Sequence, residues 1–171
     1  NELKIAREVQ AGLMPRDMPY IPGFQLAGSW RPAFGVAGDF YHIFPLDQGR
    51  WGIAIGDVAG KGTAAAMHMA TAHSLIISAA LRSRSPAAVL QEVNQMLLRQ
   101  FSPVIFVTVF LAVLDPEART LTYANAGHNP PILYKTKSRE IVQLTNGSVG
   151  MGMLDELPFV QVQSVQMDER S

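Results

Sequence analysis

Two aspartates, Asp39 and Asp57, flank a pair of short apolar segments, 40–46 and 50–56, separated by Asp47-Gln48-Gly49. A three-residue hairpin loop that ends on a left-handed glycine is common between antiparallel strands. It makes opposed residue numbers sum to 96, so that Asp39 falls opposite Asp57. Directly opposed side chains share a face of the sheet, with Cβ atoms roughly 4.5–5.5 Å apart. We therefore expect two carboxylates side by side at one end of a β-hairpin.

Carboxylates at that distance repel, so one is protonated or a cation lies between them. Oxygen ligands without cysteine or a histidine pair favour a hard ion, Mg²⁺ or Mn²⁺. The glycines around the two acids, at positions 35, 38, 56, 60 and 62, permit a close main-chain approach. Two alternatives stay open. Both aspartates could bond only to local backbone, and a two-residue loop would put them on opposite faces.

The same register sets bulky residues against small ones, which supports it independently of the aspartates. The expected pairs are Phe40 with Gly56, His42 with Ala54, and Phe44 with Gly52.

The glycine-rich turn at 56–63 has a second interpretation, as a phosphate-binding P-loop. One residue is missing between the glycines, however, and Gly62 separates Lys61 from Thr63. The pattern therefore argues against a nucleotide-binding switch.

Hydrophobic periodicity indicates strands, then two helices, then a strand meander. This order favours an α+β fold over a fold of alternating βαβ units. We expect helices at 2–14, 64–81 and 85–101, and strands at 24–30, 40–46, 51–56, 104–114, 120–126, 131–134, 140–144 and 158–167.

The composition fits one globular domain: 171 residues, 48% of them apolar and 16% charged. Fourteen basic and fourteen acidic residues balance, which argues against a nucleic-acid surface and direct membrane contact. The lack of cysteine fits a cytoplasmic location. The chain begins at Asn1 directly in helical pattern, as a piece of a larger protein would.

Three sequence motifs follow one another along the chain: GDFYH at 38–42, GDVAGKG at 56–62 and NAGHNPP at 125–131. With SVGMG at 148–152 they cover most of the chain. The sequence resembles the PPM (type 2C) protein-phosphatase superfamily, in its bacterial SpoIIE-like branch that regulates sigma factors.

The resemblance implies a four-layer α-β-β-α sandwich of two mainly antiparallel sheets covered by helices, with two Mn²⁺ or Mg²⁺ ions. It assigns Asp39, Asp57 and the carbonyl of Val58 as metal ligands. The implied reaction is hydrolysis of phosphoserine or phosphothreonine by metal-activated water, with an anti-sigma-factor antagonist as the phosphorylated partner. Residues 15–171 would form a partial phosphatase domain. Residues 1–14 would pack on the sheet, or link to an upstream sensor or response domain and form a homodimer.

The chain departs from the family pattern in two ways. His42 replaces the usual second acid of the GGDFYD motif, and in the expected register it faces away from Asp39. Family members also continue past a strand like 158–167 into YTDG-type and DD-type motifs that supply further acids, whereas this chain stops at Ser171. The alternative function is therefore a catalytically incomplete module that binds a partner and transmits a signal.

Other polar residues give weaker signals. Lys61 would either contact phosphate or stand solvated at a helix entry. His68 and His73 are five residues apart on a helix, so they point in different directions and do not form a ligand pair. His128 and Asn129 precede two prolines, and a structural turn is expected there rather than acid–base catalysis.

Overall fold

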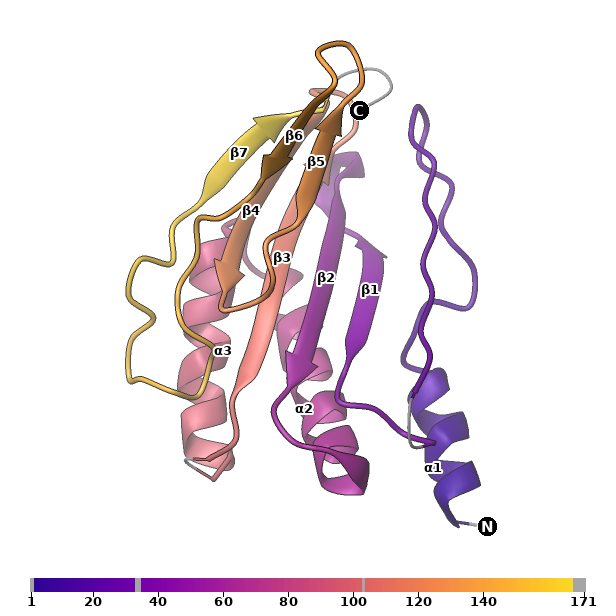
Figure 1. Ribbon diagram of the computed structural model, residues 1–171, viewed down its shortest axis with the longest axis vertical. Helices are drawn as coiled ribbons and strands as arrows, with labels where there is room; N and C mark the ends of the chain where they lie inside the picture. Colours follow the sequence, from indigo (N-terminus) through magenta and orange to yellow (C-terminus); the bar gives the residue numbers. More distant parts are fainter. Residues whose placement is uncertain (1, 33–34, 103, 168–171) are drawn as a thin grey trace.

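The computed structural model describes residues 2–32, 35–102 and 104–167. Its elements run in the order helix, two strands, two helices and five strands, with one short 3-10 turn between the first strands (Figure 1). They are α1 (Glu2–Ala11), β1 (Phe40–Pro45), the 3-10 turn Asp47–Gly49, β2 (Trp51–Val58), α2 (Gly62–Ala80), α3 (Pro86–Gln100), β3 (Val107–Asp115), β4 (Thr120–Ala126), β5 (Ile132–Lys135), β6 (Glu140–Gln143) and β7 (Gln163–Gln166).

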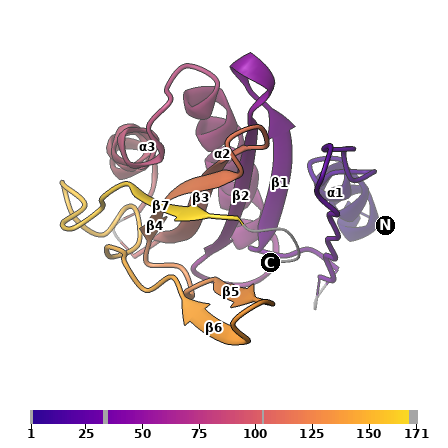
Figure 2. The same ribbon diagram turned by 90° about the horizontal axis from the view of Figure 1, so that it is seen from above.

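The main sheet has five antiparallel strands in the order β1-β2-β3-β4-β7, and β5 pairs with β6 in a second, two-stranded sheet. Figure 2 shows α2 and α3 on one face of the main sheet and β5–β6 on the other, with α1 beyond the β1 edge. The α+β fold with stacked antiparallel sheets is thus confirmed. Within the described ranges, no helix covers the outer face of β5–β6, so three of the four expected layers are seen.

Two hydrophobic cores hold these layers together. The larger lies between the main sheet and the helices, and includes Phe40, Met69, Ile76, Leu90, Leu97 and Leu111. The smaller lies between the sheets, where Leu133 and Leu144 pack with Phe110 and Tyr123. The central strands β3 and β4 therefore bury both faces, whereas β2 buries its helix side and is exposed at Ile55 and Asp57 on the other.

Helix α3 begins as its sequence predicts. The hydroxyl of Ser85 accepts a hydrogen bond from the amide of Ala88, and Pro86 occupies the first turn. Its buried stripe includes Val89, Val93 and Leu97, which face the sheet.

Several expected boundaries are wrong. Residues 24–30 form no strand; they run as an irregular segment with one isolated bridge, between Ile21 and Phe24. Helix α1 ends at Ala11 rather than at residue 14, and α2 begins two residues early, at Gly62. Strand β3 starts at Val107, and only Gln163–Gln166 of the segment 158–167 is a strand. An apolar patch makes a strand only where a neighbouring strand offers main-chain partners.

Across the described residues, the helices are all too short or too polar to cross a membrane.

Candidate metal centre

The β1–β2 hairpin has the expected register. Phe40 pairs with Gly56 and Pro45 with Trp51, so opposed numbers sum to 96. Gly49 has the expected left-handed φ of 70°, and Gln48 is also left-handed, with φ 56°. Beyond the last ladder pair, the amide of Val58 donates to the carbonyl of Gly38, 3.3 Å away. This bond carries the register one step past β1 and places Asp39 opposite Asp57.

The two faces of the hairpin are sharply different. The rings of Phe40 and Phe44 lie over Gly56 and Gly52 on the helix side, where no larger residue would fit. Asp57 is one residue out of phase with them, so it lies on the face toward β5–β6. The packing of the two phenylalanine rings against the glycines therefore sets the strand register, and the register places the carboxylates on the opposite face.

Burial raises the pKa of Asp57, and the negative charge of Asp39 and a hydrogen bond between the two carboxyl groups raise it further. The amide of Val58 opposes this by stabilising the charged form. Two carboxylates thus lie side by side with no positive side chain of the described residues among the causes of the shift, so a cation would stabilise the ionised pair.

Gly38 forms a close-fitting wall of this site. A Cβ atom added there would lie 2.7 Å from the carbonyl oxygen of Val58 and 3.3 Å from Oδ1 of Asp57. The Val58 carbonyl and the Asp57 carboxylate thus line one small space, left free because residue 38 has no side chain. With the carboxylate of Asp39, opposite Asp57, the site offers three oxygen ligands, two of them anionic. Such ligands suit a hard divalent cation.

The described residues supply only part of a metal coordination shell. Among residues 2–32, 35–102 and 104–167, no three His, Asp or Glu side chains converge on one point. The chemistry of the site fits Mg²⁺ or Mn²⁺, with Asp39, Asp57 and Val58 as the residues that would hold it. The assignment of these three as ligands stays a prediction.

The sequence did not reveal the side chains that hold Asp39 in place. The amide of Gln10, buried on α1, donates to the carbonyl of Ala37 (2.6 Å) and accepts from its N–H (2.9 Å). The indole of Trp30 donates to the carbonyl of Asp39 at 3.0 Å. Gln10 lies 27 residues from Ala37 and Trp30 nine residues from Asp39, so no helical or strand periodicity could have revealed these contacts.

His42 lies on the helix side of β1, away from Asp39, as predicted. Its Nδ1 is 3.1 Å from the carbonyl oxygen of Leu13 and 3.0 Å from Nε2 of His73. His73 is buried on α2, and burial lowers its pKa to about 4, with a smaller contribution from His42. His68 packs against the ring of Phe101 instead, so His68 and His73 are indeed not a pair.

His128 lies at the same end of the sheet as the two aspartates. Asp57 pairs with Thr108 on β3, and the Thr108 hydroxyl is 3.4 Å from the carbonyl oxygen of Asp57 and 3.0 Å from Nδ1 of His128. The predicted turn is present as well: Asn125 accepts from the amide of His128 and donates to its carbonyl. Burial lowers the pKa of His128, while the charge of Asp39 acts in the opposite direction.

Lys61 is exposed at the N-cap of α2, and its side chain makes no cap hydrogen bond. Strand β2 has antiparallel neighbours on both sides, unlike the parallel sheet of a P-loop protein. The geometry gives no support to a nucleotide site at 56–63, and a phosphate contact by Lys61 stays a prediction.

The stacked sheets with paired acids at one end define a PP2C-type phosphatase fold. The solved SiaA-PP2C domain of Pseudomonas aeruginosa superposes with a TM-score of 0.75 at 25% identity, over 98% of this chain and 66% of that one. RsbX in complex with magnesium has a TM-score of 0.64 at 18% identity, over 80% of this chain and 63% of that one, which shows the fold alone.

The sequence comparison agrees. Phosphoserine phosphatase RsbU of Bacillus subtilis (strain 168) is 29% identical over 94% of this chain and 48% of its own length. Phosphoserine phosphatase RsbP of the same organism is 28% identical over 92% of this chain and 40% of its own length. This chain thus spans less than half the length of these relatives. The model of the family described as Stage II sporulation protein E (SpoIIE) matches residues 47–171, and the chain belongs to this family.

Proposed function

We propose that this chain is the metal-binding part of a protein serine/threonine phosphatase that uses Mn²⁺ or Mg²⁺. The observation that carries the proposal is the pair Asp39–Asp57, two acids opposed on one face of the hairpin, where the charge of Asp39 raises the pKa of Asp57. Two relatives named phosphoserine phosphatase, RsbU and RsbP, support the reaction class. RsbX, which shares the fold, is solved in complex with magnesium, and the ion class is proposed by analogy with it.

In this proposal, Asp39, Asp57 and the Val58 carbonyl would hold two divalent ions together with acids from elsewhere in the complete domain. The bound ions would activate water and neutralise the charge of the phosphoryl group. Gly38 keeps the space beside the acids open, and Trp30 and Gln10 hold the segment that carries Asp39.

The proposed substrate is a phosphoserine or phosphothreonine on a regulatory protein, an anti-sigma-factor antagonist. A solved relative that contains RsbU and RsbW domains supports this class of partner. A cytoplasmic location belongs to the same proposal and fits a chain without cysteine.

The first helix would connect the phosphatase domain to an upstream sensor or response domain, or would form the interface of a homodimer. Its exposed side chains include Leu3, Ile5 and Val9, and an apolar groove between α1 and α2 is lined by Val9, Leu13 and Met67. In the full-length protein, a dimer of this kind would dissociate on Val9→Asp in sedimentation velocity; an unchanged sedimentation coefficient would rule it out.

The decisive experiment is Asp57→Asn in the full-length protein. The substitution keeps the shape of the side chain and removes its charge, so Mn²⁺-dependent hydrolysis of a phosphopeptide should fall by more than roughly 100-fold. Asp155→Asn, in the β6–β7 loop, is the matched control and should keep its activity. Undiminished Mn²⁺-dependent activity in Asp57→Asn would overturn the proposal.

The described residues bring no third acid to the site, and this favours one alternative. The chain would then be a catalytically incomplete module that binds a partner and transmits a signal. Full-length protein that binds a phosphoprotein tightly but never releases phosphate, at any Mn²⁺ concentration, would establish this alternative.

A further inference from the structure

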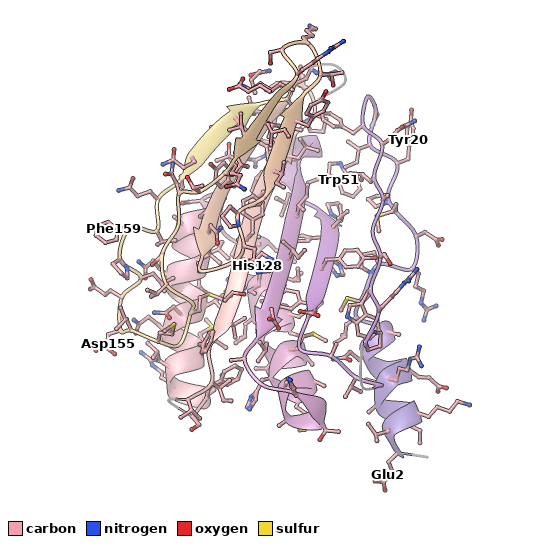
Figure 3. The ribbon with its side chains drawn as sticks, viewed as in Figure 1. Glu2, Tyr20, Trp51, His128, Asp155 and Phe159 are labelled. Carbon is pink, nitrogen blue, oxygen red and sulfur yellow. The ribbon has the colours of Figure 1, made fainter. Side chains whose placement is uncertain are left out.

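The side chain of His128 has a place in the site that its turn does not require. Its backbone is already fixed by Asn125, through bonds of 2.8 Å and 3.0 Å. Gly127 packs so tightly that an added Cβ atom would lie 2.6 Å from the amide nitrogen of Gly150. The backbone of the turn is thus held by these contacts without help from the imidazole, which lies over the middle strands of the sheet (Figure 3).

The imidazole is oriented through one of its two nitrogens. Nδ1 is 3.0 Å from the hydroxyl of Thr108, and Thr108 pairs with Asp57 across the β2–β3 ladder. Nε2 makes no hydrogen bond to any residue that the structure describes, and the ring is half-buried. One ring nitrogen is therefore held while the other remains for a ligand.

Two roles could be considered for this nitrogen, metal ligand and hydrogen-bond donor to the substrate. The charge of Asp39 acts on His128, but the described residues hold no group of three His, Asp or Glu side chains placed to bind one metal ion. His128 is therefore not placed as a third ligand beside Asp39 and Asp57 in the described part of the chain. The group that would lie next to a metal held by the two aspartates is the phosphoryl group of the substrate.

We propose that His128 binds the phosphoryl group of the substrate, with Nε2–H as a hydrogen-bond donor. The inference rests on the phosphatase function proposed above and adds a substrate-binding residue to it. Thr108 is the positioning residue, because its hydroxyl orients the ring.

The Thr108 hydroxyl also lets a neutral imidazole act as the donor. Its single proton can point to the carbonyl of Asp57, at 3.4 Å, or to Nδ1 of His128, at 3.0 Å. When the proton points to Nδ1, that nitrogen is an acceptor and Nε2 carries the ring proton. An anionic ligand would favour the tautomer with the proton on Nε2. The Thr108 hydroxyl would then lose only its longer hydrogen bond, to the carbonyl of Asp57. The half-buried ring, which disfavours the charged form, suits this arrangement.

The test is calorimetric binding of inorganic phosphate to the full-length, Mn²⁺-loaded protein, together with phosphopeptide kinetics. His128→Ala should weaken phosphate binding and lower kcat/KM by roughly 10- to 100-fold, the usual effect of losing one hydrogen bond to a charged group. His128→Gln, which keeps an N–H near the position of Nε2, should recover a large part of both. Mn²⁺ affinity should stay unchanged in each variant. Thr108→Val should weaken phosphate binding by less than His128→Ala, and Thr108→Ser should match the wild type.

His68→Ala is the matched control, since it removes a half-buried histidine that contacts Phe101 rather than the site. Equal phosphate binding by wild type and His128→Ala would overturn the proposal, as would absent phosphate binding by the wild type. A loss of Mn²⁺ affinity equal to the loss of phosphate affinity, without rescue by glutamine, would mean a structural role and also overturn it. Phosphate binding that depends on His128 in a protein without turnover would uphold the contact while the proposed function fails.

Discussion

The side-chain amide of Gln10 is hydrogen-bonded in both directions to the main chain of Ala37, two residues before Asp39. Gln10 is 4% exposed, so its side-chain amide depends on these two bonds for partners. The first helix therefore contacts the segment that carries one of the two acids, although 27 residues separate Gln10 from Ala37.

Gln10→Ala should destabilise the protein by about 1–3 kcal/mol, because it leaves the partly buried N–H and C=O of Ala37 without their protein partner. Mn²⁺ affinity should fall as well, since the segment leading to Asp39 loses its anchor. Urea unfolding and Mn²⁺ calorimetry measure the two effects. Gln100→Ala, at the exposed end of α3, is the control and should change neither quantity. Full Mn²⁺ affinity in a destabilised Gln10→Ala protein would show that the anchor supports the fold but not the site.

Gly38→Ala should abolish metal binding while leaving a folded protein. The added methyl group would lie 2.7 Å from the Val58 carbonyl oxygen and would fill the space beside Asp57. The matched control is Gly49→Ala, where φ is 70° and the added methyl group meets no atom within 4 Å. That variant should lose about 1–2 kcal/mol from left-handed backbone strain and keep its Mn²⁺ affinity. The two proteins can be compared by calorimetry and by circular dichroism, and normal Mn²⁺ binding by Gly38→Ala would contradict the assignment.

Asp57→Asn should affect stability in opposite directions with and without metal. The raised pKa of Asp57 means that its ionised form is disfavoured in the folded state. Stability of the metal-free protein should therefore fall as the pH rises through that folded-state pKa. Removing the charge relieves this cost, so in EDTA at neutral pH the variant should unfold at higher urea concentration than the wild type. Added Mn²⁺ should raise the wild-type midpoint and leave the variant's midpoint unchanged. A variant less stable than the wild type in EDTA would mean that the two acids do not repel.

His73 should make the protein sensitive to acid. Its pKa is about 4 in the folded protein against 6.5 as a free side chain, so the unfolded chain binds the extra proton between those values. Stability should thus be unaffected by His73 above pH 6.5, decline below it and level off near pH 4, with a total loss of about 3 kcal/mol. His73→Gln should reduce this decline, and His68→Gln should not. Urea midpoints at pH 7, 6, 5 and 4 provide the test, and identical pH profiles for wild type and His73→Gln would refute it.

The sequence predicted the hairpin and its register because the constraints there are local. A three-residue loop sets the pairing, and Phe40 and Phe44 need the small partners that the same register gives them. Helix α3 was equally predictable, from the cap at Ser85 and a single apolar stripe. These features use residues close together in the chain.

The remaining errors have a common physical cause. Residues 24–30 have a strand-like composition, but the edge of β1 is not paired with them, and Trp30 makes a side-chain bond to Asp39 instead. The contacts of Gln10 with Ala37 and of His42 with His73 span 27 and 31 residues. Such contacts depend on how finished elements pack, and a single sequence contains no periodic signal for them.

The stacking of Phe40 on Gly56 has an evolutionary consequence. The two residues fill one volume, since a Cβ atom at position 56 would lie 2.6 Å from Cζ of Phe40. The same Cβ atom would lie 2.8 Å from the main-chain carbonyl oxygen of Thr108 on β3, so a smaller residue at position 40 would not make room for it. Across the diverging members of this family, position 56 should therefore remain glycine as long as the neighbouring acid is kept, whatever the size of residue 40.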